Sequence, residues 1–236
     1  MDIVMVPGLW LRGSSWERVI PTLEAAGHRT HPLTLPGMES KGADRSRITL
    51  QDHVDAVVKE IDACAPDQQV VLVGHSAGCA IAHAAVDRRP NRVGRAIYVG
   101  GFPIGDGQAV ASGFRTEGGD LPMPDLSEFD DRDLADLDEP ARTAFRQQAI
   151  PSPAHLAHDP QQLSDERRYA VPVTAIATEY TTHDLRQWIA QGEEAVQEFT
   201  RIRIVEYVDL PTGHWPQLTR PVALARMILT VVEGAR

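Results

Sequence analysis

The feature that most constrains the fold is a short apolar run followed directly by a glycine-rich turn. Val70-Val71-Leu72-Val73 is apolar at every position, which is typical of a parallel strand covered on both faces. It leads into Gly74-His75-Ser76-Ala77-Gly78, and an alanine-rich helix is expected over residues 79–88. This order of strand, tight turn and helix indicates a layered α/β fold.

Further strands and helices alternate along the rest of the chain. Strands are expected at residues 3–6, 29–35, 95–100, 173–178 and 202–210, and helices at 15–26, 50–63, 184–191 and 221–232. Six strands with helical crossovers predict one α/β domain over residues 1–236, with a doubly wound, mostly parallel sheet. Ligands are then expected at the carboxyl ends of the strands.

One segment departs from this alternation. Residues 103–170 hold 14 acidic residues against six arginines and no lysine, so most of the net charge of −10 lies there. The segment also has many prolines and weak apolar periodicity. We therefore expect it to be a helical, surface-exposed insert that forms a lid on the domain.

Composition excludes several classes of protein. A hydrophobic content of 42% argues against disorder, and no run approaches the roughly 18 apolar residues of a membrane-spanning helix. The negative charge argues against nucleic acid as a partner. Cys64 and Cys79 alone give neither a disulfide framework nor a cysteine metal site. With no signal peptide at the start, we expect a cytoplasmic protein whose partner is a small-molecule substrate, with no cofactor and no metal; a homodimer is left open.

The glycine-rich turn makes Ser76 the candidate nucleophile. A turn this tight leaves no room for side chains at the two glycines, and it forces Ser76 into a strained conformation with its hydroxyl exposed above the sheet. The backbone amide of Ala77 and the following helix N-terminus would stabilise a negatively charged oxygen there.

A serine hydroxyl needs a base, and His214 is the candidate. It follows the last expected strand, which brings it to the same edge of the sheet as Ser76. The other histidines have simpler interpretations: His75 flanks the turn, His53 and His83 lie in expected helices, and His155 and His158 lack the carboxylate context of a metal pair.

A second amide for the charged oxygen should come from the loop after the first strand, Pro7-Gly8-Leu9-Trp10. Gly8 allows close approach of the backbone, and the amide of Leu9 would point into the site. Because they flank the expected loops and the nucleophile, Trp10, Trp215 and His75 are expected to contact substrate.

These motifs resemble those of α/β-hydrolases, and within them the small plant-type methyl esterase and hydroxynitrile lyase group. The similarity includes Ser15-Trp16, Leu35-Pro36-Gly37, Gly74-His75-Ser76-Ala77-Gly78 and Gly213-His214. It implies that Ser76 attacks an ester carbonyl, that the amides of Leu9 and Ala77 form the oxyanion hole, and that the insert caps the pocket. The chain departs from the group at Pro7, where a histidine is usual, and at Trp215, where the lyases carry a lysine. The second departure favours ester hydrolysis over cyanohydrin cleavage.

The resemblance places the acid that orients the histidine just after the penultimate strand. The usual aspartate aligns with Tyr180, and Glu179 stands one residue earlier. Asp106, after the preceding strand, and Asp184, at the start of an expected helix, are alternatives to Glu179. The sequence alone does not decide which of the three carboxylates orients His214.

We therefore expect a cofactor-independent serine carboxylic-ester hydrolase for a small, neutral, hydrophobic ester or lactone. Because His214 must be neutral to act as a base, kcat/KM should rise with pH through roughly 6–7. The alternatives are a lyase or carbon–carbon bond hydrolase on the same residues, and a ligand-binding or tailoring protein with a degraded triad.

Overall fold

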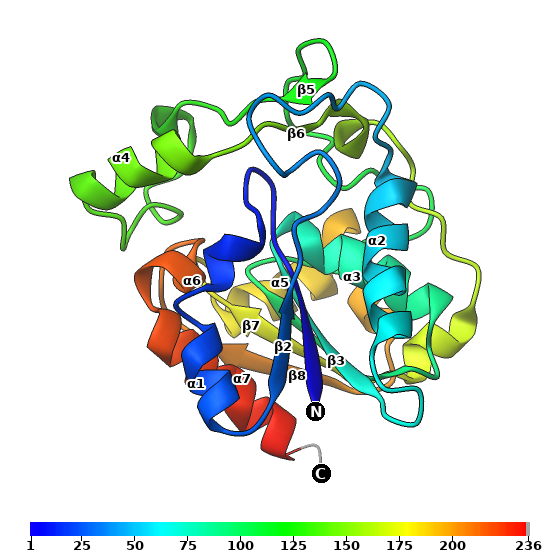
Figure 1. The fold of residues 1–236 in the computed structure, drawn as a ribbon. Coiled ribbons are helices and arrows are strands. Elements are labelled where there is room, and N and C mark those ends of the chain that lie inside the picture. Colours follow the sequence, from blue (N-terminus) through cyan, green and yellow to red (C-terminus); the bar gives the residue numbers. More distant parts are fainter. Residues whose placement is uncertain (235–236) are drawn as a thin grey trace.

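A computed structural model describes residues 1–234 and contains one six-stranded sheet with helices on both faces (Figure 1). Every strand pairing in this sheet is parallel, in the order β2-β1-β3-β4-β7-β8. The strands are β1 (Asp2–Val6), β2 (Arg29–Pro32), β3 (Val70–His75), β4 (Val93–Val99), β7 (Val173–Ala177) and β8 (Val205–Asp209). The expected doubly wound α/β fold is confirmed.

The two faces of the sheet bury different residues because side chains alternate along each strand. Val4, Leu72 and Tyr98 face a core that is covered by α2 (Leu50–Ala63), α3 (Ala77–Arg88) and α5 (Thr182–Gln191). Ile3 and Val73 face a second core, which is covered by α1 (Ile20–Ala25) and α7 (Pro221–Gly234). The sheet is thus a middle layer that holds the loops at its carboxyl edge.

The segment between β4 and β7 lies over that edge (Figure 1). It contains α4 (Glu139–Gln148) and an antiparallel pair of β5 (Asp120–Leu121) and β6 (Ser152–Pro153). Short 3₁₀ helices at Leu126–Glu128, Ala154–Ala157 and Glu166–Ala170 complete it. The expectation of a helical insert was therefore incomplete, since much of this segment is irregular and one part is a small sheet.

The region between β1 and β2 also differs from its prediction. The single helix expected over residues 15–26 is a 3₁₀ helix at Gly13–Trp16 followed by α1, which begins at Ile20. Pro21 lies in the first turn of α1, where its missing N–H costs nothing; inside a longer helix it would remove a hydrogen bond.

The chain after β7 also differs from its prediction. A 3₁₀ helix at Glu194–Arg201 occupies residues for which no element was expected, and β8 is shorter than predicted. The chain then continues through α6 (Pro216–Thr219) into α7. The helix α2 has the predicted bounds, and Thr49 caps it by accepting a hydrogen bond from the amide of Asp52.

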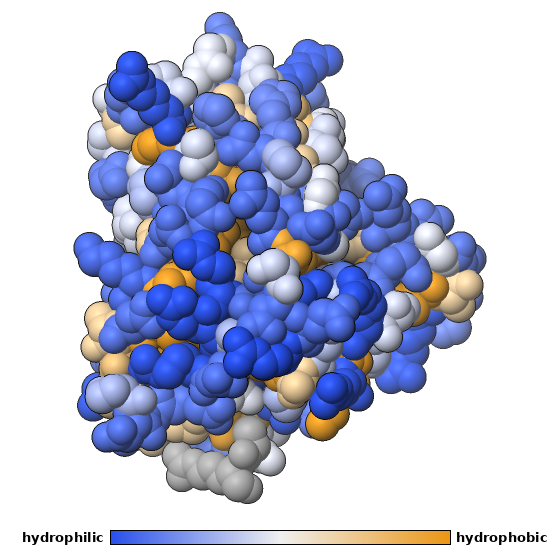
Figure 2. All heavy atoms as spheres, turned by 90° about the vertical axis from the view of Figure 1, so that its right-hand side faces the viewer, coloured by the Kyte–Doolittle hydropathy of each residue, from blue (hydrophilic) through white to orange (hydrophobic). Residues whose placement is uncertain are grey.

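The surface is mostly polar. On the face shown in Figure 2, hydrophobic residues form small, separate areas among hydrophilic ones. Among the described residues, the exposed large hydrophobic side chains are Ile204 and Val222. No helix in this part of the chain combines the length and the apolar character that crossing a membrane demands.

Candidate active site

Ser76 stands between β3 and α3 in a backbone conformation that few residues other than glycine adopt, with φ 53° and ψ −126°. The turn is closely packed. A Cβ on Gly74 would lie 2.6 Å from the carbonyl oxygen of Gly78, and one on Gly78 would lie 2.5 Å from that of Val6. The two glycines therefore let the backbone bring the Ser76 hydroxyl to the carboxyl edge of the sheet.

A continuous chain of hydrogen bonds joins three side chains at this edge. The Oγ of Ser76 lies 2.8 Å from Nε2 of His214, and Nδ1 of His214 lies 2.8 Å from Oε1 of Glu179. Ser76 follows β3, Glu179 follows β7 and His214 follows β8, so three parallel strands deliver them to one place. This arrangement allows the imidazole to take the hydroxyl proton while the carboxylate holds its other nitrogen.

The two other candidate carboxylates lie in different surroundings. Asp106 accepts a hydrogen bond from the amide of Leu163 at 2.8 Å. Asp184 accepts bonds from the amide and hydroxyl of Thr181 and caps α5. Neither is hydrogen-bonded to His214, so of the three carboxylates the structure brings Glu179 to the histidine.

The residue that aligns with the family's usual aspartate turns away from the histidine. Tyr180 is buried, and its ring packs against those of Phe102 at 5.4 Å and Trp188 at 5.3 Å between ring centroids. Glu179 takes its place and is held by a hydrogen bond from the hydroxyl of Thr178 to Oε2.

Burial and neighbouring charges have opposite effects on the pKa of His214. Burial lowers the pKa of His214, but the nearby carboxylates of Glu179 and Asp133 raise it, and the net result is a raised pKa. Burial raises the pKa of Glu179, whereas attraction to His214 and the hydrogen bonds from His214 and Thr178 lower it more, so its pKa is lowered overall. The pair therefore favours an ionised carboxylate next to the imidazole.

Asp133 was not foreseen from the sequence. It comes from the segment over the sheet, its backbone carbonyl accepts a hydrogen bond from the amide of His214 at 2.8 Å, and its half-buried carboxyl has a raised pKa because of burial. Oxygen and nitrogen atoms of Asp133, Glu179 and His214 lie within 4.8 Å of one another, an arrangement that could also hold a cation. The acidic composition of the segment was the available signal, but it could not indicate which carboxylate reaches the histidine.

Leu9 and Ala77, whose backbone amides are the predicted oxyanion donors, both line the cavity beside Ser76. Neither amide has an acceptor among the described residues, so both are free to bind an oxygen of a ligand. The next residue, Trp10, has a positive φ of 62° and donates its amide to the hydroxyl of Ser152 at 2.9 Å. Contact with β6 thus holds the loop that presents Leu9.

The cavity at Ser76 has a volume of about 400 Å³ and walls of two kinds. Its aromatic part contains Trp10, whose ring packs edge-on against Phe114 and Phe129. Its acidic part comprises Glu128, Asp130 and Asp133, in addition to Glu179. Trp10, which was predicted to contact substrate, therefore lies on the wall of this cavity.

The structure places His75 and Trp215 behind the cavity wall, so the expectation that they contact substrate is corrected. His75 is fully buried; its Nε2 donates to the carbonyl of His214 at 2.7 Å and its Nδ1 accepts from Gln217 at 3.1 Å. Burial lowers its pKa to about 3. Trp215 packs against the rings of Phe145 and His214 at 4.8 and 5.0 Å between ring centroids. Both residues support His214 from the protein side.

The profile of the alpha/beta hydrolase family matches residues 3–227, which is nearly the whole described chain. The chain belongs to this family. The predicted resemblance to plant methyl esterases is also confirmed by relatives. The chain is 32% identical over 103 residues to salicylic acid-binding protein 2 of Nicotiana tabacum, and 28% identical over 134 residues to methylesterase 9 of Arabidopsis thaliana. The matches cover 42% and 55% of this chain but only 38% and 51% of those relatives.

Solved structures extend the similarity of the fold to the full length. An extracellular α/β-hydrolase from a Paenibacillus species superposes with a TM-score of 0.78 at 19% identity, covering 98% of both chains. At this identity the match shows the fold of the chain alone, and it extends over the segment at the carboxyl edge of the sheet.

Proposed function

We propose that this chain is a cofactor-independent serine hydrolase that cleaves a small, neutral, hydrophobic carboxylic ester or lactone through an acyl-enzyme. The observation that carries the proposal is the unbroken hydrogen-bonded chain from Ser76 through His214 to Glu179 on the wall of a cavity. The names of the relatives, a methylesterase among them, agree with ester hydrolysis.

The geometry suggests a two-step mechanism. His214 takes the proton of Ser76 as its Oγ attacks the carbonyl carbon, and the resulting oxyanion accepts hydrogen bonds from the amides of Leu9 and Ala77. His214 then gives the proton to the departing alcohol, which leaves the acyl group on Ser76. In the second step His214 removes a proton from water as the water oxygen attacks the acyl carbon. The bond from that carbon to Oγ of Ser76 then breaks, His214 returns the proton to Oγ, and the product leaves as a carboxylic acid that ionises in solvent.

The walls of the cavity support the substrate class. Trp10, Phe114 and Phe129 offer apolar surface for an acyl or alcohol group. Glu128, Asp130 and Asp133 face the same space, and they repel a substrate that carries a carboxylate. No lysine or arginine lines this cavity among the described residues, so nothing there compensates an anionic substrate.

Covalent labelling with a fluorophosphonate probe tests the nucleophile. We expect the wild-type chain to be labelled at Ser76 and to hydrolyse p-nitrophenyl esters with a burst of p-nitrophenol. Ser76→Ala should lose labelling and lower kcat by about 10⁴-fold or more, with an unchanged melting temperature. Labelling at another residue, or undiminished turnover by folded Ser76→Ala, would contradict the proposal.

Analysis of products separates hydrolysis from the other chemistry that such a site can perform. Ester hydrolysis releases an alcohol and a carboxylate in equal amounts. Release of an aldehyde or ketone by wild type, lost in Ser76→Ala, would instead indicate a lyase or a carbon–carbon bond hydrolase. Binding of a small ligand without turnover would indicate a receptor.

A further inference from the structure

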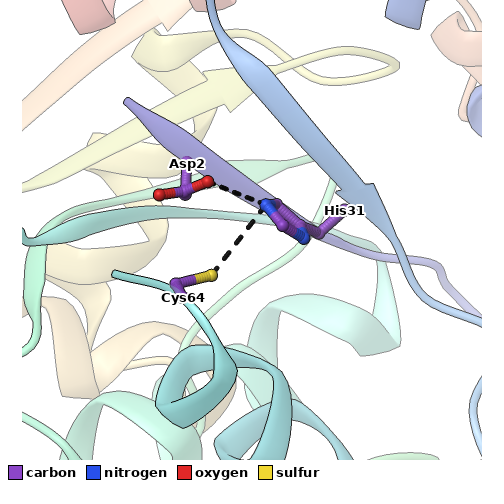
Figure 3. A group of neighbouring side chains, drawn as sticks. All are labelled: Asp2, His31 and Cys64. Carbon is purple, nitrogen blue, oxygen red and sulfur yellow. Dashed lines mark hydrogen bonds and ion pairs between the residues drawn. The ribbon is translucent and has the colours of Figure 1, made fainter. Parts of the chain in front are cut away.

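A second group of chemically active side chains lies at the opposite end of the sheet from Ser76. Asp2 opens β1, His31 lies on β2, and Cys64 follows the last residue of α2 (Figure 3). Nε2 of His31 is 2.9 Å from Oδ1 of Asp2 and 3.9 Å from Sγ of Cys64. Asp2 and Cys64 are buried, and the side chain of His31 is 26% exposed.

A fourth residue orients the imidazole. Oε1 of Glu60, one turn before the end of α2, lies 2.7 Å from Nδ1 of His31. A carboxylate on one ring nitrogen fixes the tautomer that leaves the other nitrogen free to bind a metal, and it strengthens that nitrogen as a ligand. In His31 this leaves Nε2, the atom that faces both Asp2 and Cys64 (Figure 3).

We propose that Asp2, His31 and Cys64 form a zinc site, with Glu60 as the group that positions His31. A carboxylate, an imidazole and a thiolate are all ligands that Zn²⁺ uses. Tetrahedral coordination at the usual bond lengths sets ligand atoms about 3.3–3.6 Å apart. The present distances of 2.9 and 3.9 Å bracket this range, so small side-chain movements suffice. Water would be the fourth ligand.

The charges around the site determine which ligand neutralises the charge of a bound zinc ion. Arg29 forms a bidentate pair with Asp2 at 2.7 Å, and Arg92 donates to the carbonyl of Cys64 at 3.2 Å. The two guanidinium groups balance the carboxylates of Asp2 and Glu60. The charge of a bound Zn²⁺ must therefore be reduced by the Cys64 thiolate, which forms as coordination releases the thiol proton to solvent.

The position of the site implies a structural role. Its ligands join β1, the edge strand β2 and the end of α2, so a bound metal would tie the end of this helix to two strands that are already paired in the sheet. A metal that binds only the folded chain, and not the unfolded one, stabilises the fold by mass action. The cysteine count did not indicate this site because its ligands come from three separate elements, with one cysteine among them.

Cobalt spectroscopy tests the proposal on the full chain. Co²⁺ at a thiolate site gives a sulfur-to-metal charge-transfer band in the near ultraviolet, together with the visible bands of tetrahedral cobalt. We expect these in wild type and in Ser76→Ala, with loss of both when Zn²⁺ is added. Cys64→Ser should lose the charge-transfer band, whereas Cys79→Ser, at the other buried cysteine, should keep it.

The cluster of Asp133, Glu179 and His214 contains no sulfur, so cobalt bound there would give no such band. Its occupation would instead inhibit ester hydrolysis equally in wild type and Cys64→Ser. Absence of the charge-transfer band in folded wild type, or its persistence in Cys64→Ser, would overturn the zinc site without affecting the proposed function.

Affinity and stability provide a second readout. Glu60→Gln keeps all three ligands but weakens the orientation of His31, and we expect it to lower the affinity for Zn²⁺ by about 10- to 100-fold. Zn²⁺ should raise the melting temperature of wild type and of Cys79→Ser, and EDTA should reverse the rise. An equal rise in Cys64→Ser would contradict the proposal.

Discussion

The pKa of His214 depends on two carboxylates that come from different parts of the fold. Because Glu179 and Asp133 raise that pKa above its ordinary value of 6.5 against the effect of burial, the imidazole stays protonated to a higher pH than a free histidine. A protonated imidazole cannot accept the proton of Ser76. We therefore expect kcat/KM to rise with pH with a midpoint above 6.5, measured on a neutral ester. A flat profile between pH 5 and 8 would contradict the role of His214.

Glu179→Gln tests the partner of the histidine. Without the negative charge, burial acts on His214 with less opposition, so its pKa falls and the midpoint of kcat/KM moves to lower pH. The loss of orientation should also reduce kcat by about 10²- to 10⁴-fold. Asp106→Asn and Asp184→Asn remove equal charge from carboxylates not bonded to His214, and they should leave the midpoint in place. A shift in either control equal to that in Glu179→Gln would refute the assignment.

At the scale of single residues, the sequence predicted which reacting side chains follow strands better than it predicted where the neighbouring side chains point. Ser76 and His214 were predicted from their places after strands, and the structure puts them 2.8 Å apart. His75 and Trp215 were wrongly expected to contact substrate. A position next to a reacting residue in the sequence does not determine which way a side chain points. Both of these side chains are buried in the packed interior.

Among the elements, the turn between β3 and α3 tolerates the least change. A Cβ on Gly78 would meet backbone oxygens of Val6 and Pro7 at 2.5 and 2.6 Å, and backbone cannot move aside as a side chain can. We expect Gly78→Ala to lower the melting temperature and to displace Ser76, with loss of activity. Gly113→Ala is the matched control, since a Cβ there meets nothing within 4 Å. Its melting temperature should stay the same or rise slightly. Equal stability of the two variants would show that the turn is not tightly packed.

Helices and strands were predicted correctly where burial alone determines the pattern of apolar residues. The strands β1 and β3 are buried throughout and carry apolar runs at residues 3–6 and 70–73, because both faces of the sheet are covered there, and α2 carries one apolar stripe with a capping threonine at its start. The errors fall where a local constraint interrupts a pattern. Pro21 divides an apolar period that otherwise reads as one helix, and short 3₁₀ helices such as Glu194–Arg201 leave a weak periodic signal.

In the molecule as a whole, a buried ionic network fastens the end of the lid segment to the domain. Arg168 contacts Asp87 of α3 at 2.9 Å and Glu198 at 3.2 Å, and all three side chains are buried. Arg168→Ala would leave two buried carboxylates without their cation, so we expect a loss of about 3–5 kcal/mol in the free energy of unfolding, measured with urea. Arg167→Ala is the neighbouring control. Its pair with Asp165 is exposed, and the change should be much smaller. Comparable losses would mean that the buried network does not hold the segment.

Three carboxylates of the segment between β4 and β7, those of Glu128, Asp130 and Asp133, line the cavity at Ser76. Asp130 and its neighbour Asp131 are both exposed, but only Asp130 lines the cavity. For a neutral ester and its carboxylate-bearing analogue, we expect the ratio of kcat/KM to favour the neutral one by about tenfold at low salt. The ratio should fall as ionic strength approaches 1 M, where the screening length shrinks to about 3 Å.

Matched charge removal separates a local effect from the field of the whole molecule. Asp130→Asn should reduce the preference for the neutral ester at low salt, and Asp131→Asn should reduce it less, although both variants lose the same formal charge. If the two variants behave alike, the discrimination arises from the summed charge of the chain and not from the carboxylates that face the cavity. If salt leaves the ratio unchanged in wild type, electrostatic repulsion does not set the preference at all, and shape or apolar contact with Trp10, Phe114 and Phe129 must account for it.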